Sequence, residues 1–376
     1  MWFTQGFVND LGQIALGFNP ATENQAQQIT PIALGTSGSN INDTGRTCCG
    51  GTLGSLVQDN SGNTYILSNN HVIARLGSAQ IGEQIIQRGY IDTTPTCSST
   101  GVISVAQLSQ FVPILFGGTA GNQVDAAVAQ TFPGSVDPMG TILGVGTISS
   151  TITAPALGMQ VEKSGRTTGV TTGSIDNIAV TVKVAYQACG SNTKQVAKFT
   201  KQFTVLPLET VGRSGDSGSL ILRTGLNPNP VGLLFASDPT GRTVANRIDQ
   251  VLPALSSRIG SQLSFVGTTP LEAGSSDLSY GTPDPLVDEV AAVKDRYDDF
   301  LFKLPEVVGH GVSYSKNVPG RLVIRLFVKK LTSVVQKSTP AALEGVPIEI
   351  EETGEISALQ TCALAPQSNK PTAKHK

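Results

Sequence analysis

Charged residues are scarce in this 376-residue chain, where Asp, Glu, Lys and Arg together make up 14%, against roughly 25% in an average soluble domain. The formal net charge is −2, which argues against a general nucleic-acid binder, because such a protein needs a basic face. No apolar run reaches the length of a membrane span. We therefore expect no nucleic acid and no membrane among the partners of the chain.

Cysteines are few as well: Cys48, Cys49, Cys97, Cys189 and Cys362. Their odd number and scattered spacing do not indicate a disulfide framework, and no C-x-x-C pair with matching histidines indicates zinc. The adjacent pair Cys48 and Cys49 would rarely form a bond, because the ring would be strained. The sequence thus predicts small buried thiols with one exposed, no metal and no cofactor.

Lys and Arg are absent from the first 45 residues, and Arg46 is the first basic residue. A secretory signal needs a basic n-region and an apolar h-region, and residues 1–20 contain neither cleanly. The sequence as written is expected to be cytoplasmic by default. Its low charge would also suit a secreted protein, so secretion stays open.

Glycine is abundant, with 41 residues, and Ser, Thr, Asn and Gln take the place of charged residues. Gly and Asn tolerate positive φ, so this mixture suits a β-rich fold with many tight turns. Short apolar runs recur from residue 51 to about 250, as at 52–57 and 64–68 around an Asn/Gly turn. They predict a sandwich or barrels rather than βαβ units. Helical spacing over residues 246–259 is expected to close this part.

The composition changes after residue 266, and five parts are predicted. An irregular N-terminal segment (1–45) precedes the β-rich part (46–266). The Gly, Thr, Pro, Ser and Asp residues of 267–285 predict a linker. Residues 286–359 read as αββαβ, which predicts a small α+β sandwich domain, and residues 360–376 are predicted to be a disordered tail.

The strongest chemical signal is Gly-Asp-Ser-Gly at 215–218. A serine hydroxyl is a poor nucleophile until a base removes its proton, and acyl transfer needs backbone N–H groups directed at the developing oxyanion. Glycines on both sides of Asp216 and Ser217 allow a tight turn that exposes the serine Oγ. The expected oxyanion donors are the N–H groups of Gly215 and Ser217. The alternative interpretation is an ordinary Gly/Ser hairpin.

The catalytic base is nearly fixed by counting, because the chain has three histidines: His71, His310 and His375. His375 lies in the predicted tail and His310 in the second domain, which leaves His71. The carboxylate that would orient the imidazole and stabilise its cation is predicted to be Asp125, at the head of an apolar run where a bare Asp would be costly. Without the serine motif, His71 and Asp125 would read as a structural histidine and a turn residue.

The order His71, Asp125, Ser217, each in its own local motif, resembles the trypsin-like (chymotrypsin-fold) serine proteases over about residues 46–265. The run at 161–169, with the Ser-Asn-Asn-His that ends at His71, resembles more narrowly a bacterial and plant group that includes the plant narrow-leaf proteins. The resemblance implies a mostly β fold of two six-stranded antiparallel β-barrels with the triad between them. His71 and Asp125 would come from the first barrel and Ser217 from the second.

The resemblance also implies substrate-binding residues. In the family, an acidic residue six places before the serine selects Lys or Arg. Here that position is Val211, so a basic preference is not expected. Ser214 is counted with the substrate-binding residues. The run Leu234, Phe235 and Ala236 resembles the strand edge that pairs with the substrate backbone by strand addition.

Activation departs from the animal enzymes of this family. Those enzymes are cut after a basic residue, and the new amine pairs with the aspartate before the serine, but no Lys or Arg precedes Arg46. Asp216 must therefore have another partner, either a backbone amide or a nearby cation. The paired cysteines of the animal enzymes also look absent, in keeping with a chain that folds without disulfides.

The residues together predict a serine endopeptidase, a hydrolase that cuts protein or peptide substrates through an acyl-enzyme. The alternative is a catalytically silent protease fold that serves as a binding or scaffold protein, against which the intact His, Asp and Ser argue. A two-carboxylate hydrolase would need a paired acidic motif, which is missing. The sequence leaves a homo-oligomer open.

Overall fold

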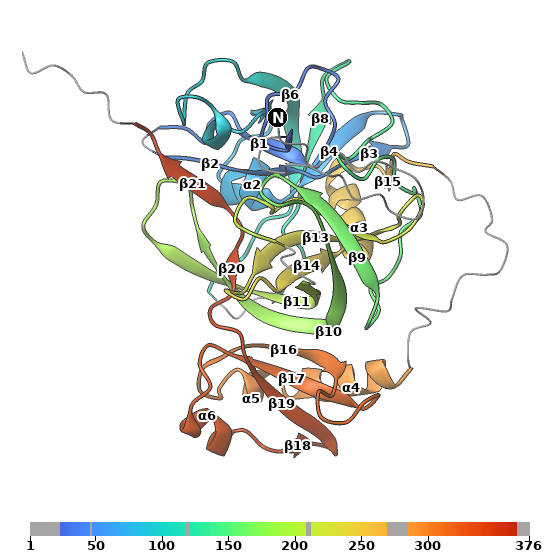
Figure 1. Ribbon diagram of the computed structural model, residues 1–376, viewed down its shortest axis with the longest axis vertical. Coiled ribbons are helices and arrows are strands. Elements are labelled where there is room, and N and C mark those ends of the chain that lie inside the picture. Colours follow the sequence, from blue (N-terminus) through green and yellow to red (C-terminus); the bar gives the residue numbers. More distant parts are fainter. Residues whose placement is uncertain (1–22, 46, 118–120, 208–211, 269–284, 367–376) are drawn as a thin grey trace, which may run out of the picture.

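The structure is a computed structural model that describes residues 23–45, 47–117, 121–207, 212–268 and 285–366. Two multi-stranded β-sheets form most of it, which confirms the prediction of a mostly β protein. Figure 1 shows the first sheet above the second, with the helices and strands of residues 285–352 at the lower end. Within the described part of the chain, no helix combines the length and apolarity needed to cross a membrane.

The first sheet contains nine strands. They are β1 (Thr36–Asn40), β2 (Thr47–Leu53), β3 (Ser55–Asp59), β4 (Thr64–Ser68), β5 (Gln84–Gln87), β6 (Ile103–Phe111), β8 (Ala127–Thr131), β15 (Leu263–Phe265) and β21 (Thr361–Leu364). Their spatial order is β15-β3-β4-β8-β6-β5-β1-β2-β21. This sheet exceeds the six strands expected: seven of its strands lie between residues 36 and 131, and β15 and β21 join it from later in the chain.

Gly54 alone separates β2 from β3, so one bent segment supplies strands near both ends of the first sheet. A Cβ atom at Gly54 would lie 2.0 Å from the carbonyl oxygen of Gly218. Such a contact is impossible for a side chain, so only glycine allows the bend to approach the turn that carries Ser217. Thr52 lies in the same segment, and its N–H donates a hydrogen bond to the Ser217 carbonyl at 2.8 Å. The bend therefore joins the first sheet to the serine turn.

The second sheet contains the other twelve named strands of the described residues. They are β7 (Gly121–Asn122), β9 (Gln160–Gly165), β10 (Gly169–Gln187), β11 (Lys194–Pro207), β12 (Leu220–Arg223), β13 (Pro230–Ser237), β14 (Thr243–Arg247), β16 (Val307–Tyr314), β17 (Leu322–Val328), β18 (Ala342–Leu343), β19 (Val346–Glu352) and β20 (Ser357–Ala358). Pairing runs from β10 through β9, β12, β13, β14 and β11 and returns to β10. The hydrogen bonding of these six strands therefore closes into a ring.

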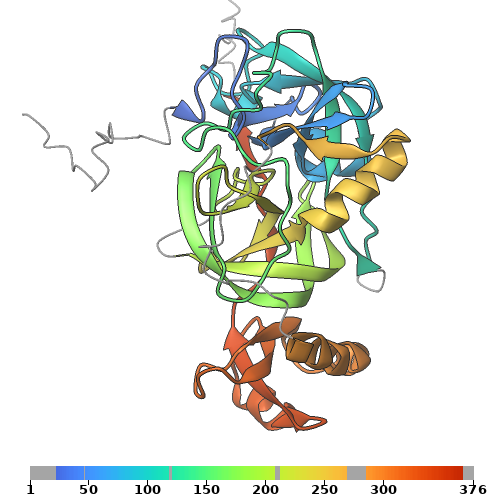
Figure 2. The same ribbon diagram turned by 90° about the vertical axis from the view of Figure 1, so that its right-hand side faces the viewer.

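The predicted helix at 246–259 is present as α3 (Ile248–Ile259). Its buried residues Val251 and Leu255 pack into the core of the first sheet, although α3 directly follows β14 of the second (Figure 2). Gly260 ends α3 with a φ of 76°, a left-handed conformation that glycine adopts without steric cost. The helix thus bridges the cores of the two sheets. Before it, helix α2 (Asn70–Ile73) forms a single turn in the described residues, followed by short 3₁₀ turns at Arg75–Gly77 and Tyr90–Asp92.

The C-terminal part has the predicted order of helices and strands, with two short additions. It consists of α4 (Pro285–Arg296), α5 (Asp298–Leu301), β16, β17, α6 (Ser333–Ser338), β18 and β19. Valines of α4 share a hydrophobic core with β16 and β17, and α4 lies against one face of these strands in Figure 2. β16 also pairs antiparallel with β10, so these strands extend the second sheet. The predicted linker falls mostly on residues 269–284, outside the described residues.

Two predictions of irregular chain were wrong where the structure describes them. Strand β1 lies inside the segment 1–45, where it pairs with β2 and β5. Strand β21 lies inside the predicted tail, where it pairs antiparallel with β2. Neither stretch has a strand period of its own, and β21 pairs with a strand far away in sequence. Residues 1–22 and 367–376 lie outside the described part.

The prediction of unpaired thiols was also wrong. Cys48 forms a disulfide with Cys97, and the Cys49 sulfur lies at bonding distance from the sulfurs of both Cys189 and Cys362. Successive side chains of β2 point to opposite faces, so Cys48 and Cys49 meet different partners. One sulfur forms one disulfide, so Cys189 and Cys362 are alternative partners of Cys49. Sequence spacing does not show that these distant segments converge.

The buried carboxyl of Asp43 should make stability depend on pH. Burial raises its pKa, Arg75 opposes the rise and Glu83 adds to it, and together they bring the pKa to about 7. Because the folded pKa exceeds the unfolded value of 3.8, the native state holds this proton more tightly. The contribution of Asp43 to stability is therefore lost as pH rises from about 4 to about 7.

Asp43→Asn should remove this dependence. At about 1.4 kcal/mol per pKa unit, the free energy of unfolding of the variant relative to the wild type should be higher at pH 8 than at pH 4 by up to roughly 4 kcal/mol. Urea unfolding at both pH values measures it. The exposed Asp288 provides Asp288→Asn as a control for loss of charge. An Asp43→Asn effect that is equal at both pH values would contradict this assignment.

Candidate active site

His71 and Asp125 are brought together by the first sheet. His71 lies in α2, directly after β4, and Asp125 lies just before β8, the strand that pairs with β4. His71 Nδ1 is 2.5 Å from Asp125 Oδ2, and the His71 N–H donates to Asp125 Oδ1 at 3.2 Å. Both side chains are fully buried. His71 Nε2 is buried without a hydrogen-bond partner among the described residues, so it is available to accept a proton.

Asp125 receives further support from the second sheet. The Tyr186 hydroxyl, from β10, donates to Asp125 Oδ2 at 2.9 Å, and the Asp125 N–H donates to Asn246 Oδ1 at 3.0 Å. Burial, followed by the nearby Asp125 charge, raises the pKa of Tyr186 well above its usual value. The hydroxyl therefore stays protonated and acts as a donor. Sequence reasoning missed Tyr186, because nothing in its local sequence marks it.

Ser217 lies in the turn before β12, where Gly215 and Gly218 have φ values of 102° and 94°. These positive values require glycine, as the sequence motif predicts. A Cβ at Gly218 would also lie 2.2 Å from the carbonyl oxygen of Thr52. The buried Ser217 Oγ donates to the carbonyl oxygen of Phe235 at 3.1 Å. The glycines thus set the hydroxyl against β13.

Asp216 is held by groups already present in the chain, as expected from the missing activation site. Its carboxylate accepts the N–H groups of Thr167 at 2.8 Å, Thr168 at 3.1 Å and Arg213 at 2.8 Å. The Lys163 ammonium is 3.7 Å away, and both side chains are fully buried. Burial lowers the pKa of Lys163, while Asp216 opposes that shift. The serine turn is therefore fixed by backbone amides and a buried ion pair.

The predicted substrate-binding residues fall into three groups. Leu234, Phe235 and Ala236, hereafter the binding edge, lie in β13, and β20 pairs with this strand. Ser214 is exposed, and its carbonyl accepts the Thr167 hydroxyl at 2.7 Å. Val211 lies outside the described residues.

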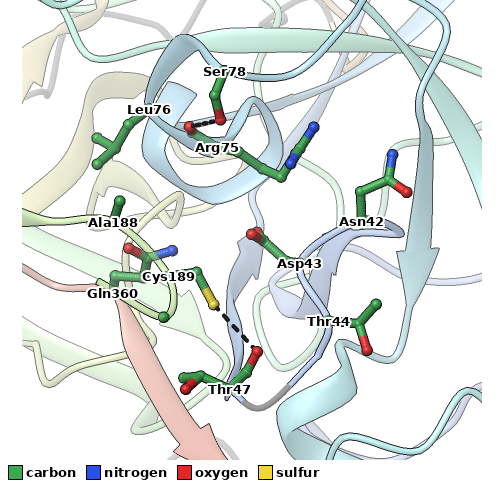
Figure 3. Close-up of a pocket in the computed structure, with 11 residues that line it drawn as sticks. Asn42, Asp43, Thr44, Thr47, Arg75, Leu76, Ser78, Ala188, Cys189 and Gln360 are labelled. Atoms are coloured by element: carbon green, nitrogen blue, oxygen red, sulfur yellow. Dashed lines mark hydrogen bonds between the residues drawn. The ribbon is translucent and has the colours of Figure 1, made fainter. Parts of the chain in front are cut away.

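A pocket of about 320 Å³ is lined in part by Gln360 of the C-terminal end of the described chain (Figure 3). Its lining residues are Asn42, Asp43, Thr44, Thr47, Arg75, Leu76, Ser78, Ala188, Cys189, Gly190 and Gln360. The Gln360 side chain, which Figure 3 shows beside Ala188 and Cys189, donates from Nε2 to the carbonyl oxygen of His71 at 3.2 Å. The pocket therefore lies on the His71 side of the site.

The described residues include one group with the spacing of metal ligands. The sulfurs of Cys49, Cys189 and Cys362 lie within 4.8 Å of one another. Thiolates rather than disulfide sulfurs bind metal, so only a reduced form of this group has the required chemistry.

No family model matches the chain, and no curated protein matches it. Similar solved structures include a glutamic acid specific serine protease (17% identity, 62% of this chain, 100% of that chain, TM-score 0.40). Protease A of Thermobifida fusca (18%, 63%, 99%, TM-score 0.38) and a chymotrypsin of Cellulomonas bogoriensis (15%, 63%, 99%, TM-score 0.37) are also similar. At these identities and TM-scores, the similarities do not establish a family or an activity.

Proposed function

We propose that the chain is a serine endopeptidase with Ser217 as nucleophile, His71 as general base and Asp125 as the group that orients the imidazole. The observation that carries the proposal is the His71–Asp125 pair, whose buried Nε2 has no partner among the described residues. The bend that contains Thr52 joins this pair to the serine turn. The Thr52 N–H binds the Ser217 carbonyl, and the Thr52 carbonyl accepts the Ser68 hydroxyl three residues before His71.

In the proposed reaction, Ser217 Oγ attacks the substrate carbonyl carbon while His71 Nε2 takes its proton. Asp125 stabilises the imidazolium, and the Gly215 and Ser217 N–H groups stabilise the oxyanion. The imidazolium then protonates the leaving amine, and water hydrolyses the acyl-enzyme. Before attack, the Ser217 hydroxyl must rotate away from the Phe235 carbonyl. No step needs a metal or cofactor.

The proposal is tested by a fluorophosphonate probe, followed by digestion and mass spectrometry. Ser217 should be the modified residue in the wild type, and Ser217→Ala should remain unmodified. Hydrolysis of a peptide library by the same preparation gives an independent measurement. A folded protein that neither reacts with the probe nor cuts any peptide would favour a catalytically silent binding protein, the alternative that no observation in the structure favours.

Tyr186→Phe should lower kcat/KM about 10-fold, equivalent to ~1.4 kcal/mol of transition-state stabilisation. The variant loses the hydrogen bond to Asp125 but retains the ring that packs against His71 and Phe199. The matched control is Tyr65→Phe, because the Tyr65 hydroxyl donates to Asp59 instead. Equal activity of the two variants would show that the Tyr186 hydroxyl does not support the site.

We also propose the predicted division of the chain, with residues 46–266 as the protease domain and a small added domain after the linker. A separate hydrophobic core formed by α4, β16 and β17 supports this division. The narrower resemblance to the bacterial and plant group that includes the plant narrow-leaf proteins is part of the same proposal.

A further inference from the structure

After β19, the chain turns back and crosses the candidate active site. Residues 356–364, hereafter the C-terminal segment, include β20 and β21. In Figure 1 this red segment rises from the C-terminal helices and strands, passes the second sheet and ends at the first. Its path brings it to the binding edge, to the serine turn and to His71, in that order.

The first half of the segment forms a strand on the binding edge. β20 pairs antiparallel with β13, with Ser357 opposite Ser237 and Ala358 opposite Ala236. The Leu359 N–H donates to the Phe235 carbonyl oxygen at 3.0 Å. The segment therefore makes the strand-addition contacts that the sequence assigns to a substrate.

The carbonyl of Leu359 accepts a hydrogen bond from one of the two predicted oxyanion donors. The Gly215 N–H donates to the Leu359 oxygen at 2.6 Å, and Gly215 is the predicted oxyanion donor two residues before Ser217. Donors of this kind act at roughly 2.7–3.1 Å from the oxyanion. The bond presented to Ser217 is therefore that between Leu359 and Gln360.

The second half of the segment lies on the side where a leaving group would be. The Gln360 side chain donates to the His71 carbonyl oxygen, and β21 pairs with β2, with Thr361 opposite Gly50 and Cys362 opposite Cys49. Backbone or side-chain contacts thus hold both sides of the Leu359–Gln360 bond.

The Leu359 side chain shows which residue the site accepts before that bond. It is 4% exposed and belongs to an apolar cluster with Met159, Val161, Phe203 and Leu234, among others. A Cβ at Gly212 would lie 3.3 Å from Leu359 Cδ1, so the serine turn forms one wall. An apolar environment of this kind favours an aliphatic side chain and penalises a charge.

We propose that the intact chain cuts itself between Leu359 and Gln360, and that the same pocket selects a leucine-sized aliphatic residue in other substrates. This inference rests on the proposed peptidase function. Ser217 Oγ forms an ester with the Leu359 carbonyl carbon, the bond to the Gln360 nitrogen breaks, and His71 passes the serine proton to that nitrogen. Water then hydrolyses the ester, which gives a new carboxyl terminus at Leu359, restores Ser217 and releases residues 360–376.

Before the cut, the segment excludes other substrates, because it fills the binding edge and the oxyanion position. The alternative partners of Cys49 affect the released peptide. A Cys49–Cys362 disulfide would keep residues 360–376 attached after the cut, whereas a Cys49–Cys189 disulfide would let them leave. Cleavage must therefore be measured after reduction.

The first experiment compares full-length wild type and Ser217→Ala by intact mass spectrometry under reducing conditions. The wild type should convert to a chain that ends at Leu359, at a rate independent of protein concentration because the reaction is intramolecular. Ser217→Ala should retain its full mass. Equal cleavage in Ser217→Ala would assign the cut to another protease and overturn the proposal.

Two full-length variants of Leu359 sharpen the test. Leu359→Met conserves volume and polarity and should still be cut. Leu359→Asp should remain uncut, because a charge does not fit the apolar pocket. Its Ser217 should react with a fluorophosphonate on the order of tenfold or more faster than in uncut wild type, because a tethered competitor acts at millimolar effective concentration. A misfolded variant would not show this gain.

The outcomes separate the two proposals. If the wild type reacts with the probe and cuts added peptides while its own Leu359–Gln360 bond stays intact, self-cleavage is wrong and the peptidase function stands. If Leu359→Met and Leu359→Asp are cut equally, the pocket does not select the residue. If no variant reacts with the probe or cuts any peptide, both proposals fail.

Discussion

Replacement of either Ser217 or His71 by Ala is expected to lower kcat for peptide hydrolysis by about five to six orders of magnitude. Ser217→Ala removes the nucleophile, and His71→Ala removes the base whose Nε2 is buried and unpartnered among the described residues. The double variant should be no less active than either single variant, because the two groups act as one unit. Asp125→Asn should lower kcat by less, on the order of 10⁴-fold.

The comparison needs a chain whose site is open. Ser217→Ala cannot remove its own C-terminal segment, so lost activity could reflect a filled site rather than a missing nucleophile. Each variant should therefore also be made together with Leu359→Asp, and kcat measured on a leucine-containing peptide. Ser61→Ala, in the exposed turn between β3 and β4, is the control. Wild-type turnover by Ser217→Ala in the open chain would refute the mechanism.

The parts of the site that could be predicted are those fixed by local sequence. The turn around Ser217 needs glycines at positive φ, and such glycines are visible in a sequence. His71 was found by counting, and Asp125 by the cost of leaving a carboxylate unpaired at the head of an apolar strand. In each case a local physical requirement restricts the residue type.

The parts that could not be predicted depend on contacts between distant segments. Tyr186 reaches Asp125 from the other sheet, and only its position in the folded chain gives its hydroxyl a role. Lys163 is one basic residue among many in the sequence, yet its ammonium is buried beside Asp216. The same holds for the C-terminal segment, because strand addition depends on an unpaired edge rather than on the added sequence.

Lys163→Met is expected to destabilise the protein by about 3–5 kcal/mol, because it leaves the Asp216 charge buried without its cation. Asp216→Asn should destabilise the protein by a similar amount, because it leaves the Lys163 ammonium buried beside a neutral partner. The amides of Thr167, Thr168 and Arg213 would still bind the Asp216 carboxylate in Lys163→Met. They do not replace a positive charge, so the serine turn should loosen and activity should fall with stability.

The double variant Lys163→Met with Asp216→Asn distinguishes a coupled ion pair from two independent buried residues. It contains neither buried charge, so its loss of stability should be smaller than the sum of the single losses by on the order of 1–3 kcal/mol. Urea unfolding of all four proteins measures the coupling. The control is Lys316→Met, which removes an exposed lysine paired with Glu351. Its free energy of unfolding should stay within about 1 kcal/mol of the wild-type value. Additive losses would mean that the Lys163 and Asp216 charges do not stabilise each other. Coupled losses would mean that the buried cation stabilises the turn that carries Ser217 in the uncut chain, without any new amino terminus.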